Sequence, residues 1–456
     1  MIMLESRFSS VQEFSSSFKA FVNEKSTEFK EKCNQIKSVS FIAYLLFILF
    51  GLVSWTAANG ALSESPVLTA ILPECYKLTS YIVIIVQCAN IGPLAYLLVW
   101  AVVKLIWKKT HYLDIAVIYC ILCFAFITSI FIIIFWSQEV VIYDDVTVSI
   151  PFFILTGCLA VCDCTSTVLF LPFVALYPTP YISALYVGEG LSGVLPSLWA
   201  LVQGSASREC HQTGNPIKGL RFSPTIYFIV ITVITTISFI AFTLILFLPL
   251  VRRERNHMTT ITVFKNSPET ENTSETLVPS QRVLQPGEYK TNYVALVQYI
   301  CIQVILCAFA NSFLYSIAPY FTIPYGSSTF LLSINLTLIA VPIGSFLGGV
   351  IKPRATLSLW CMLATYLLIC IWLIFLSVLI EPKPLEGSLI GELHVIVLFS
   401  LSGLIAGYLK VGVGVLAKKE GGPTFLLLIA LGTQLGSFIG GLVAFLLVNY
   451  TLIFKV

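Results

Sequence analysis

The sequence predicts an all-α polytopic membrane protein, and three observations lead to this fold class. Of the 456 residues, 57% are hydrophobic and only 11% are charged, whereas soluble globular chains carry about 25% charged residues. The apolar residues gather in runs long enough to cross a bilayer. A long polar segment separates the first six of these runs from the last five. The apolar surplus must therefore face lipid, on helices arranged in two groups.

Eleven segments are candidates for transmembrane helices. A helix needs about 20 apolar residues to cross the hydrocarbon core, because lipid offers no partner for unpaired backbone groups. The segments are 39–61, 79–103, 114–136, 150–176, 181–203, 225–250, 292–316, 327–350, 356–380, 393–416 and 424–449. The fifth is interrupted by Gly188, Gly190, Gly193 and Pro196 and also carries Glu189. We expect its backbone to be loosened there and held by neighbouring groups or by substrate.

Polar segments divide the chain into four parts. These are a cytoplasmic tail at 1–37, an amino-terminal bundle at 38–250, a cytoplasmic linker at 251–290 and a carboxy-terminal bundle at 291–456. In the tail, Phe14, Phe18, Phe21 and Val22 have helical spacing, which indicates either an amphipathic helix on the inner leaflet or a disordered tail. The linker is too polar to bury a core. Two bundles joined by a long inner loop are typical of transporters that rock around a central site.

The distribution of basic residues predicts the orientation of the chain. Lysine and arginine accumulate in the cytoplasmic segments of membrane proteins. With the amino terminus inside, 19 of the 26 basic residues fall in inner segments, six in outer segments, and Lys410 within a span. We therefore place the amino terminus in the cytoplasm and the carboxy terminus outside. On the outer side, Asn449 begins a glycosylation sequon beside the membrane, and a disulfide between Cys75 and Cys210 is left open.

Composition and motifs exclude several function classes. A net charge of +3 is too small to indicate nucleic-acid binding. The four histidines fall at or beyond the ends of apolar runs and no His/Cys cluster has metal-ligand spacing, so we expect neither a metal nor a cofactor. The sequence has no P-loop, which argues against an ATP-driven pump. It has no constellation of nucleophile and base either, which argues against an enzyme. Membrane lipid is the partner that the composition requires.

Three ionisable side chains lie within the predicted spans, where such groups are costly unless they face a cavity or a partner. Asp163 lies in the middle of the fourth span, Glu189 in the fifth and Lys410 deep in the tenth. Asp163 and Lys410 come from different bundles and have opposite charges. They could form a buried pair that breaks as the bundles separate, or hydroxyl and carbonyl groups could hold each of them. Glu189 could instead cap the loosened backbone beside it.

Aromatic and amide side chains at membrane depth favour a flat ligand. Trp55 and Asn59 are four residues apart and share one helix face. An aromatic plane beside an amide suits a heteroaromatic molecule, although an interfacial tryptophan and a capping asparagine explain the pair equally well. Asn90 and Gln434 are further amides within spans, where hydrogen bonding between helices is the commoner use.

Several sequence blocks resemble the eukaryotic riboflavin (vitamin B2) transporter family of solute carriers. The blocks are 54–60 (SWTAANG) with Glu64 and 72–74 (LPE), 87–94 (QCANIGPL), 163–167 (DCTST) with 170–173 (FLPF), 187–193 (VGEGLSG) with Pro196, Gln203 and Gly204, 408–411 (YLKV) and 434–437 (QLGS). The block in the fifth span is the most specific. Together the blocks reach from the first span to the last, and they leave out the tail and the linker.

This resemblance implies a major-facilitator-like fold of eleven transmembrane helices in a six-plus-five arrangement, which nucleoside transporters share. It also implies sodium-independent, facilitated uptake of riboflavin across the plasma membrane. We expect this uptake to proceed by alternating access, and we expect the chain to act as a monomer. Two alternatives stay open: a nucleoside or other heteroaromatic solute carrier, and a membrane receptor that carries no flux.

We expect the substrate site near the bilayer midplane, between the two bundles. Riboflavin is a planar tricycle with an imide edge and a neutral ribityl chain, so aromatic rings would stack on it while amides and hydroxyls bind its polar groups. The candidate substrate-binding residues are Trp55, Asn59, Asn90, Asp163, Thr165, Ser166, Phe170, Phe173 and Gln434. The candidates for gating or coupling are Glu74, Asp163, Glu189 and Lys410.

Overall fold

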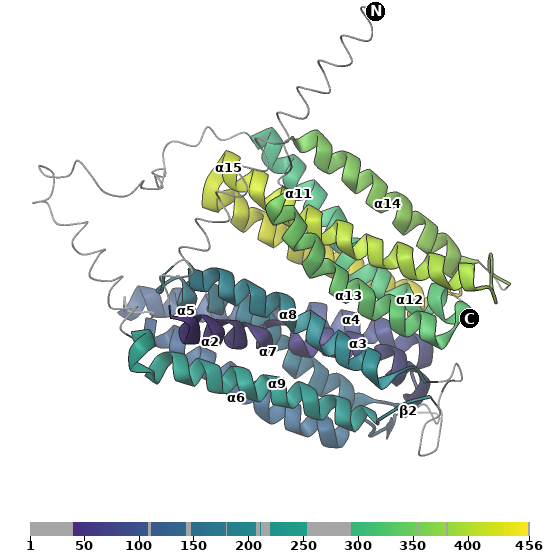
Figure 1. Cartoon of the computed structure of the whole chain (residues 1–456), viewed down its shortest axis with the longest axis horizontal. Helices are drawn as coiled ribbons and strands as arrows, with labels where there is room; N and C mark the ends of the chain where they lie inside the picture. The colour runs from purple at the N-terminus through teal and green to yellow at the C-terminus, as the bar shows by residue number, and fades with distance from the viewer. Residues whose placement is uncertain are drawn as a thin grey trace, which may run out of the picture.

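The protein, as a computed structural model, consists almost wholly of long helices in two groups (Figure 1). The structure describes residues 40–107, 111–142, 147–178, 180–206, 210, 219–252, 293–351, 353, 355–379 and 382–454. We call residues 40–252 the amino-terminal half and residues 293–454 the carboxy-terminal half. The amphipathic helix expected in the tail and nearly all of the expected linker lie outside the described residues.

The amino-terminal half contains six spans among its described residues, when the bent first helix pair is counted as one. Its helices and 3₁₀ turns are α2 (Phe41–Gly51), η1 (Leu52–Ser54), α3 (Thr56–Ile71), η2 (Cys75–Lys77), α4 (Leu78–Cys88), α5 (Ile91–Trp107), α6 (His111–Phe135), α7 (Ile150–Val174), α8 (Pro180–Gln203) and α9 (Pro224–Phe247). A short antiparallel pair, β1 (Val140–Val141) and β2 (Thr147–Val148), lies between α6 and α7. Figure 1 shows this half in purple to teal.

The carboxy-terminal half contains five spans among its described residues. Its elements are α11 (Tyr293–Ala308), the π turn η4 (Phe309–Phe313), α12 (Leu314–Thr322), the 3₁₀ turn η5 (Ile323–Tyr325), α13 (Ser327–Val350), α14 (Thr356–Val378) and α15 (Leu389–Tyr450). α15 holds two spans, Leu389–Glu420 and Phe425–Tyr450. The chain reverses direction between them, so both ends of α15 lie at the same end of the half (Figure 1).

The predicted fold class is confirmed. Ten helices in the described part are long and apolar enough to cross a membrane, and the bent pair α2–α3 supplies an eleventh span. Large apolar side chains such as Leu98 and Leu105 are exposed at 70% and 83%. Such exposure suits helices that face lipid, since their backbone groups are already paired and their side chains need no water.

Two spans are longer and less regular than the sequence predicts. The first continues to Ile71 and bends by 56° between Ser54 and Thr56, at a point without glycine or proline. The seventh continues to Tyr325 and contains the π turn η4. π turns inside α-helices are rare and often occur at functional sites. Neither irregularity has a local sequence cause, so both must be held by contacts with other helices.

The fifth span corrects our expectation of a loosened backbone. α8 is one continuous helix from Pro180 to Gln203. Its glycines allow close packing instead: a Cβ at Gly188 would overlap the carbonyl oxygen of Ile48, and one at Gly51 would lie 2.5 Å from that of Leu185. α2 and α8 therefore pack backbone to backbone, as small residues permit in membrane helices.

A similar glycine seam joins α13 to the first span of α15. A Cβ at Gly344 would overlap the carbonyl oxygen of Leu404, and one at Gly407 would overlap that of Val341. At both glycines, an added Cβ would be closer to the facing carbonyl oxygen than a van der Waals contact allows. The seam therefore tolerates only hydrogen at these positions, and it binds the two helices into one unit.

The two halves meet at one end of the molecule. There, α3 and α4 contact α12, α13 and α15, and hydrogen bonds join Ser205 to Ser328 at 3.0 Å and Asn449 to Ser80 at 3.1 Å. Toward the other end, the ribbons of the two halves diverge (Figure 1). We call the contacting end the closed end. The side chain of Asn449 is engaged there, which disfavours its use as a glycosylation site.

Candidate functional site

The bend in the first span places a helix amino terminus inside the membrane. α3 begins at Thr56, directly after Trp55, whose backbone is not helical (φ −138°, ψ 13°). The first N–H groups of a helix have no partner within it. The carboxylate of Asp163, which is only 2% exposed, accepts the N–H of Ala58 at 2.8 Å and also that of Ala57. A carboxylate in this position also lies at the positive end of the helix dipole.

Asp163 thus holds the bend in the first span, and its neighbour Ser166 does the same. The Ser166 hydroxyl lies 2.7 Å from the carbonyl oxygen of Asp163 and 3.2 Å from that of Ser54, so it links α7 to η1. Lys410 has a different partner, described below, so the buried pair with Asp163 that the sequence left open is not formed in this structure.

Thr165 and Glu74 also make contacts within the amino-terminal half. Thr165 donates to Val161 O at 2.6 Å, and a Cβ at Gly92 would lie 2.5 Å from its hydroxyl, so Thr165 packs against α5. Glu74 accepts the N–H of Ser149 at 2.6 Å and its hydroxyl at 3.0 Å. It thereby fixes the start of α7 to the turn after α3.

The candidate ring-stacking residues Phe170 and Phe173 lie in the core of the amino-terminal half. Each is 2% exposed. The ring of Phe50 lies 4.2 Å from that of Phe170, measured between centroids, and Phe242 lies 5.3 Å from Phe173. Their rings fill the space between α2, α7 and α9. We therefore withdraw both from the proposed site, because a ligand could reach them only by displacing packed rings.

Trp55, Asn59 and Glu189 lie together where α3 meets α8. Trp55 and Glu189 share a side-chain hydrogen bond, in which the indole N–H donates to the carboxylate. Asn59 and Leu338 of α13 both lie close to Gly193 of α8. A Cβ built on Gly193 would be 3.2 Å from the amide nitrogen of Asn59 and 3.8 Å from the carbonyl oxygen of Leu338. All three side chains are half-buried. This group, which we call the tryptophan group, therefore borders the carboxy-terminal half.

Lys410 and the π turn form the corresponding group in the carboxy-terminal half. The ammonium of Lys410 donates to Asn311 Oδ1 at 2.5 Å, and the Asn311 amide donates to Ser437 Oγ at 2.8 Å. Ser312, next in the π turn, donates to Ser437 O at 2.6 Å. Lys410 and Asn311 are half-buried. We call Lys410, Asn311 and Ser437 the lysine group; it presents positive charge and amide groups at membrane depth.

The carboxy-terminal half approaches the amino-terminal half at Gln87, next to Ser312 of the π turn. Asn90 donates to Gln87 O at 3.1 Å, and its Oδ1 is buried without a partner in the described part of the chain. A Cβ at Gly441 would lie 3.1 Å from the Gln87 side chain and 3.6 Å from that of Ser312. Gln434 lies two turns before Gly441 on the same face of α15 and is half-buried. Gln434 therefore shares the face of α15 that meets α4, and Asn90 lies in the turn after α4, bonded to Gln87.

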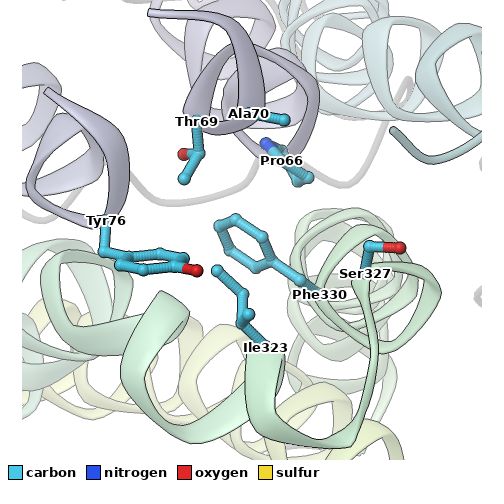
Figure 2. A pocket seen from close by; sticks show the side chains of 7 residues that line it. All are labelled: Pro66, Thr69, Ala70, Tyr76, Ile323, Ser327 and Phe330. Carbon is cyan, nitrogen blue, oxygen red and sulfur yellow. The ribbon is translucent and has the colours of Figure 1, made fainter. Parts of the chain in front are cut away.

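The closed end is sealed mainly by apolar side chains. A small pocket there is lined by Pro66, Thr69, Ala70, Tyr76, Ile323, Ser327 and Phe330. Figure 2 shows the ring of Phe330 directed from α13 toward Pro66 of α3, with Tyr76 and Ile323 beside it. The hydroxyl of Thr69 is buried without a partner among the described residues. Few polar contacts join the halves here, so this closure can separate without breaking a strong network.

Sequence reasoning missed Asn311, Ser437 and the buried carboxyl of Glu64. Glu64 is 0% exposed and accepts a hydrogen bond from Gln203 at 2.9 Å. The first span was expected to end at 61, so Glu64 seemed to lie in an outer loop. Asn311 meets the criterion that selected Asn90, because it is an amide side chain within a predicted span, 292–316. In the described part of the chain, no three His, Cys, Asp or Glu side chains are placed to hold a metal ion.

Two half-bundles with polar groups on their facing surfaces give the chain a fold of the major-facilitator type. The fold is similar to that of a mutant form of the nucleoside transporter NupG, with a TM-score of 0.51 and 10% identity over 90% of this chain and 91% of that one. It is also similar to the E. coli xylose transporter XylE, solved in a partially occluded inward open conformation, with a TM-score of 0.51 and 12% identity over 90% and 91% of the two chains.

Residues 39–456 match the family model described as solute carrier family 52, riboflavin transporter, and the chain belongs to this family. Solute carrier family 52 member 3-A of Danio rerio is 30% identical over 90% of this chain and 96% of its own length. The human member 3 is 27% identical over 91% and 98%. Riboflavin transporter rft-1 of Caenorhabditis elegans is 27% identical over 89% and 96%. The chain is therefore a transporter, not an enzyme.

Proposed function

We propose that the protein carries riboflavin into the cell across the plasma membrane, without sodium, by alternating access. The observation that supports this most is the family match over residues 39–456, which includes every span. The arrangement of the halves supports the mechanism, because contacts concentrate at one end and the helices diverge at the other. A carrier that alternates between two openings needs one end closed at a time.

The proposed binding residues come from both halves. Trp55 supplies an aromatic plane and Asn59 an amide on the amino-terminal side. Gln434 and the lysine group supply amide, hydroxyl and ammonium groups on the other side. The isoalloxazine ring would stack on Trp55, while the imide and ribityl groups hydrogen bond to the amides. Asn90 is the further amide on the amino-terminal side.

The remaining polar candidates have supporting roles in this proposal. Asp163 and Ser166 hold the bend that presents Trp55. Glu189 orients the indole through its hydrogen bond. Lys410 contacts substrate and, through Asn311, links it to the π turn. This division assigns substrate contact to half-buried groups and assigns structure to buried ones.

We further propose that the closed end faces outward and that the molecule acts as a monomer. The distribution of lysine and arginine supports an orientation with the amino terminus in the cytoplasm and the carboxy terminus outside, because basic residues accumulate in cytoplasmic segments. The end at which the ribbons of the two halves diverge would then face the cytoplasm. Cysteine labelling with a membrane-impermeant reagent at Glu139→Cys, in an exposed outer segment, tests this orientation on intact cells.

Uptake of radiolabelled riboflavin in transfected cells tests the function. We expect saturable uptake above that of cells with empty vector, unchanged when sodium is replaced by choline. Excess unlabelled riboflavin should abolish it, whereas excess adenosine or uridine should not. Competition by the nucleosides instead would identify a nucleoside or other heteroaromatic carrier.

Counterflow in liposomes separates a carrier from a receptor. Purified protein would be reconstituted in vesicles loaded with unlabelled riboflavin, and labelled riboflavin would be added outside. A carrier exchanges the two and accumulates label transiently, whereas a receptor binds label only up to the number of protein molecules. Binding without accumulation would contradict the proposed transport.

A further inference from the structure

A buried carboxyl group in the amino-terminal half takes no part in the proposed substrate site. Glu64 lies in the third turn of α3 and is 0% exposed. Its Oε1 accepts a hydrogen bond from Nε2 of Gln203, the last residue of α8, at 2.9 Å. Its Oε2 is buried without a partner in the described part of the chain. The Oε1 atom of Gln203 is likewise buried and unpartnered there.

The described groups around Glu64 do not supply a counter-charge. The ionisable group that faces it is the Tyr227 hydroxyl of α9, which donates to Gly60 O at 3.1 Å. α8 adds the hydroxyl of Ser197, which pairs with Ser63 at 3.1 Å. A carboxylate buried with a single donor loses far more solvation than one hydrogen bond returns. Ionised Glu64 would therefore be strongly disfavoured here.

Other charged or ionisable side chains on the elements around α3 point elsewhere. Among the acidic groups, Asp163 of α7 binds the first turn of α3, Glu189 of α8 binds Trp55, and Glu74 binds Ser149. Tyr81 of α4 stacks on Phe153. Of the basic groups, Lys77 of η2 is exposed, and the guanidinium of Arg221 donates to Val202 O. Among the residues that the structure describes, no side chain is placed to balance a negative charge on Glu64, which favours its protonated form.

A protonated carboxyl satisfies both unpartnered oxygens at once. A carboxylic acid has one O–H donor, and a primary amide has both an N–H donor and a carbonyl acceptor. With Nε2 of Gln203 donating to Oε1 of Glu64, the Oε2–H of the acid can donate to Oε1 of Gln203 and close a cyclic pair. We propose that Glu64 is a proton-binding site, protonated in this conformation, that exchanges its proton with the outer medium when the closed end opens.

Both partners of this acid–amide pair lie next to contacts between the halves. Ser63, which precedes Glu64, accepts a hydrogen bond through its backbone oxygen from Asn335 of α13 at 3.3 Å. Ser205, two residues after Gln203, pairs with Ser328 of α13 at 3.0 Å. Separation of the halves at the closed end breaks both contacts. Water then gains access to α3 and α8 on either side of the pair, so the proton can leave or return.

Infrared spectroscopy of the purified full chain in lipid nanodiscs tests the protonation directly. We expect a protonated-carboxyl band near neutral pH that disappears in Glu64→Gln and persists in Glu139→Gln, a matched change at an exposed position. Glutamine can keep the cyclic pair with Gln203, so this variant should fold. If Glu64→Gln removes no protonated-carboxyl band, Glu64 is ionised and the proposal is overturned.

A disulfide across the closed end tests the link to opening. Ser205→Cys and Ser328→Cys together should form one, since the two hydroxyl oxygens are already 3.0 Å apart. In the locked protein we expect deuterium exchange of the Glu64 carboxyl to slow by at least about ten-fold, and reduction to restore it, whereas Ser205→Cys alone should not change it. Equal exchange in locked and reduced protein overturns the linkage to opening.

Uptake gives a further readout that rests on the proposed function. Glu64→Gln should carry riboflavin at acidic external pH and lose most of the dependence of uptake on external pH. A pH profile identical to that of the wild type would overturn a role for this proton in transport. If the chain carries no riboflavin at all, the infrared measurements still decide the protonation of Glu64.

Discussion

The first helix of each half is irregular within the membrane, but the two irregularities are stabilised in opposite ways. In the amino-terminal half, the bend before α3 exposes backbone N–H groups, and the buried carboxylate of Asp163 accepts two of them. In the carboxy-terminal half, the π turn presents the Asn311 amide, which accepts from the ammonium of Lys410. The carboxylate of Asp163 is bound by backbone N–H groups and is buried, whereas the ammonium of Lys410 is bound by a side chain and is half-buried.

This difference indicates which charge is available for substrate. Asp163 cannot turn away without leaving helix N–H groups unpaired in the membrane, which is costly. Asn311 can rotate its amide, and Lys410 has a long flexible stem, so the lysine group can exchange partners when a ligand arrives. We infer that the amino-terminal bend is a fixed support and that the π turn is the adaptable side of the site.

Phe170→Ala should have the largest effect on stability. Phe170 packs against Phe50 behind the bend, and removal of a buried ring typically costs about 3 to 5 kcal/mol. We expect the melting temperature in detergent to fall sharply, while the KM for riboflavin of the surviving protein stays unchanged. Leu171→Ala, at a more exposed position on the same helix, is the matched control. A raised KM with unchanged melting would return Phe170 to the binding site.

Asp163→Leu should have the second-largest effect on stability. It leaves the N–H groups of α3 unpaired, a loss of about 1 to 3 kcal/mol, so both surface expression and uptake should fall. Asp163→Asn keeps one acceptor oxygen and should be milder. Surface biotinylation and thermal melting check the result. Normal melting in both variants would show that Asp163 does not hold the bend.

Lys410→Met should reduce uptake roughly ten-fold, which corresponds to about 1.4 kcal/mol, with little change in melting. Methionine keeps the apolar stem but removes the ammonium that binds Asn311. Lys418→Met, at an exposed position on the same helix, should behave as the wild type. Uptake at the wild-type rate in Lys410→Met would remove the lysine group from the proposed site.

Asn59→Ala should have the smallest effect, a loss of one hydrogen bond to substrate worth about 1 kcal/mol. We expect a several-fold increase in KM, with surface expression unchanged because the side chain is half-buried. Concentration dependence of riboflavin uptake, normalised to surface protein, measures it. A lowered maximal rate at constant KM would indicate a part in conformational change instead.

The sequence was sufficient for the number and approximate position of the spans, because length and apolarity decide what can cross a bilayer, but it did not predict that the first and seventh continue to Ile71 and Tyr325. The same sequence reasoning made Trp55, Asn59, Glu189 and Lys410 candidates, since polar groups at membrane depth need a reason to be there, and their roles stay predictions. The sequence did not predict that Asp163 caps α3 or that Phe170 lies in the core. An aspartate that caps a distant helix and one that binds a ligand have the same local sequence, and only packing separates them.

The irregular turns in the first and seventh spans were also not predicted from the sequence. Neither Trp55 nor Asn311 is itself a glycine or a proline, so the residues at these two positions do not predict a break or a π turn. The irregularities arise from helices that are remote in sequence, α7 in one case and α15 in the other. A single sequence records such long-range causes only as isolated polar residues.

The glycine seam between α13 and α15 bears on how inherited variants of this chain can be interpreted. A methyl group at Gly344 or Gly407 has no room, because a carbonyl oxygen already occupies its place. A substitution of either glycine would thus be a defect of assembly, and little folded protein would reach the membrane. A substitution that weakens a ligand contact would instead leave the folded protein in the membrane, with its defect confined to binding.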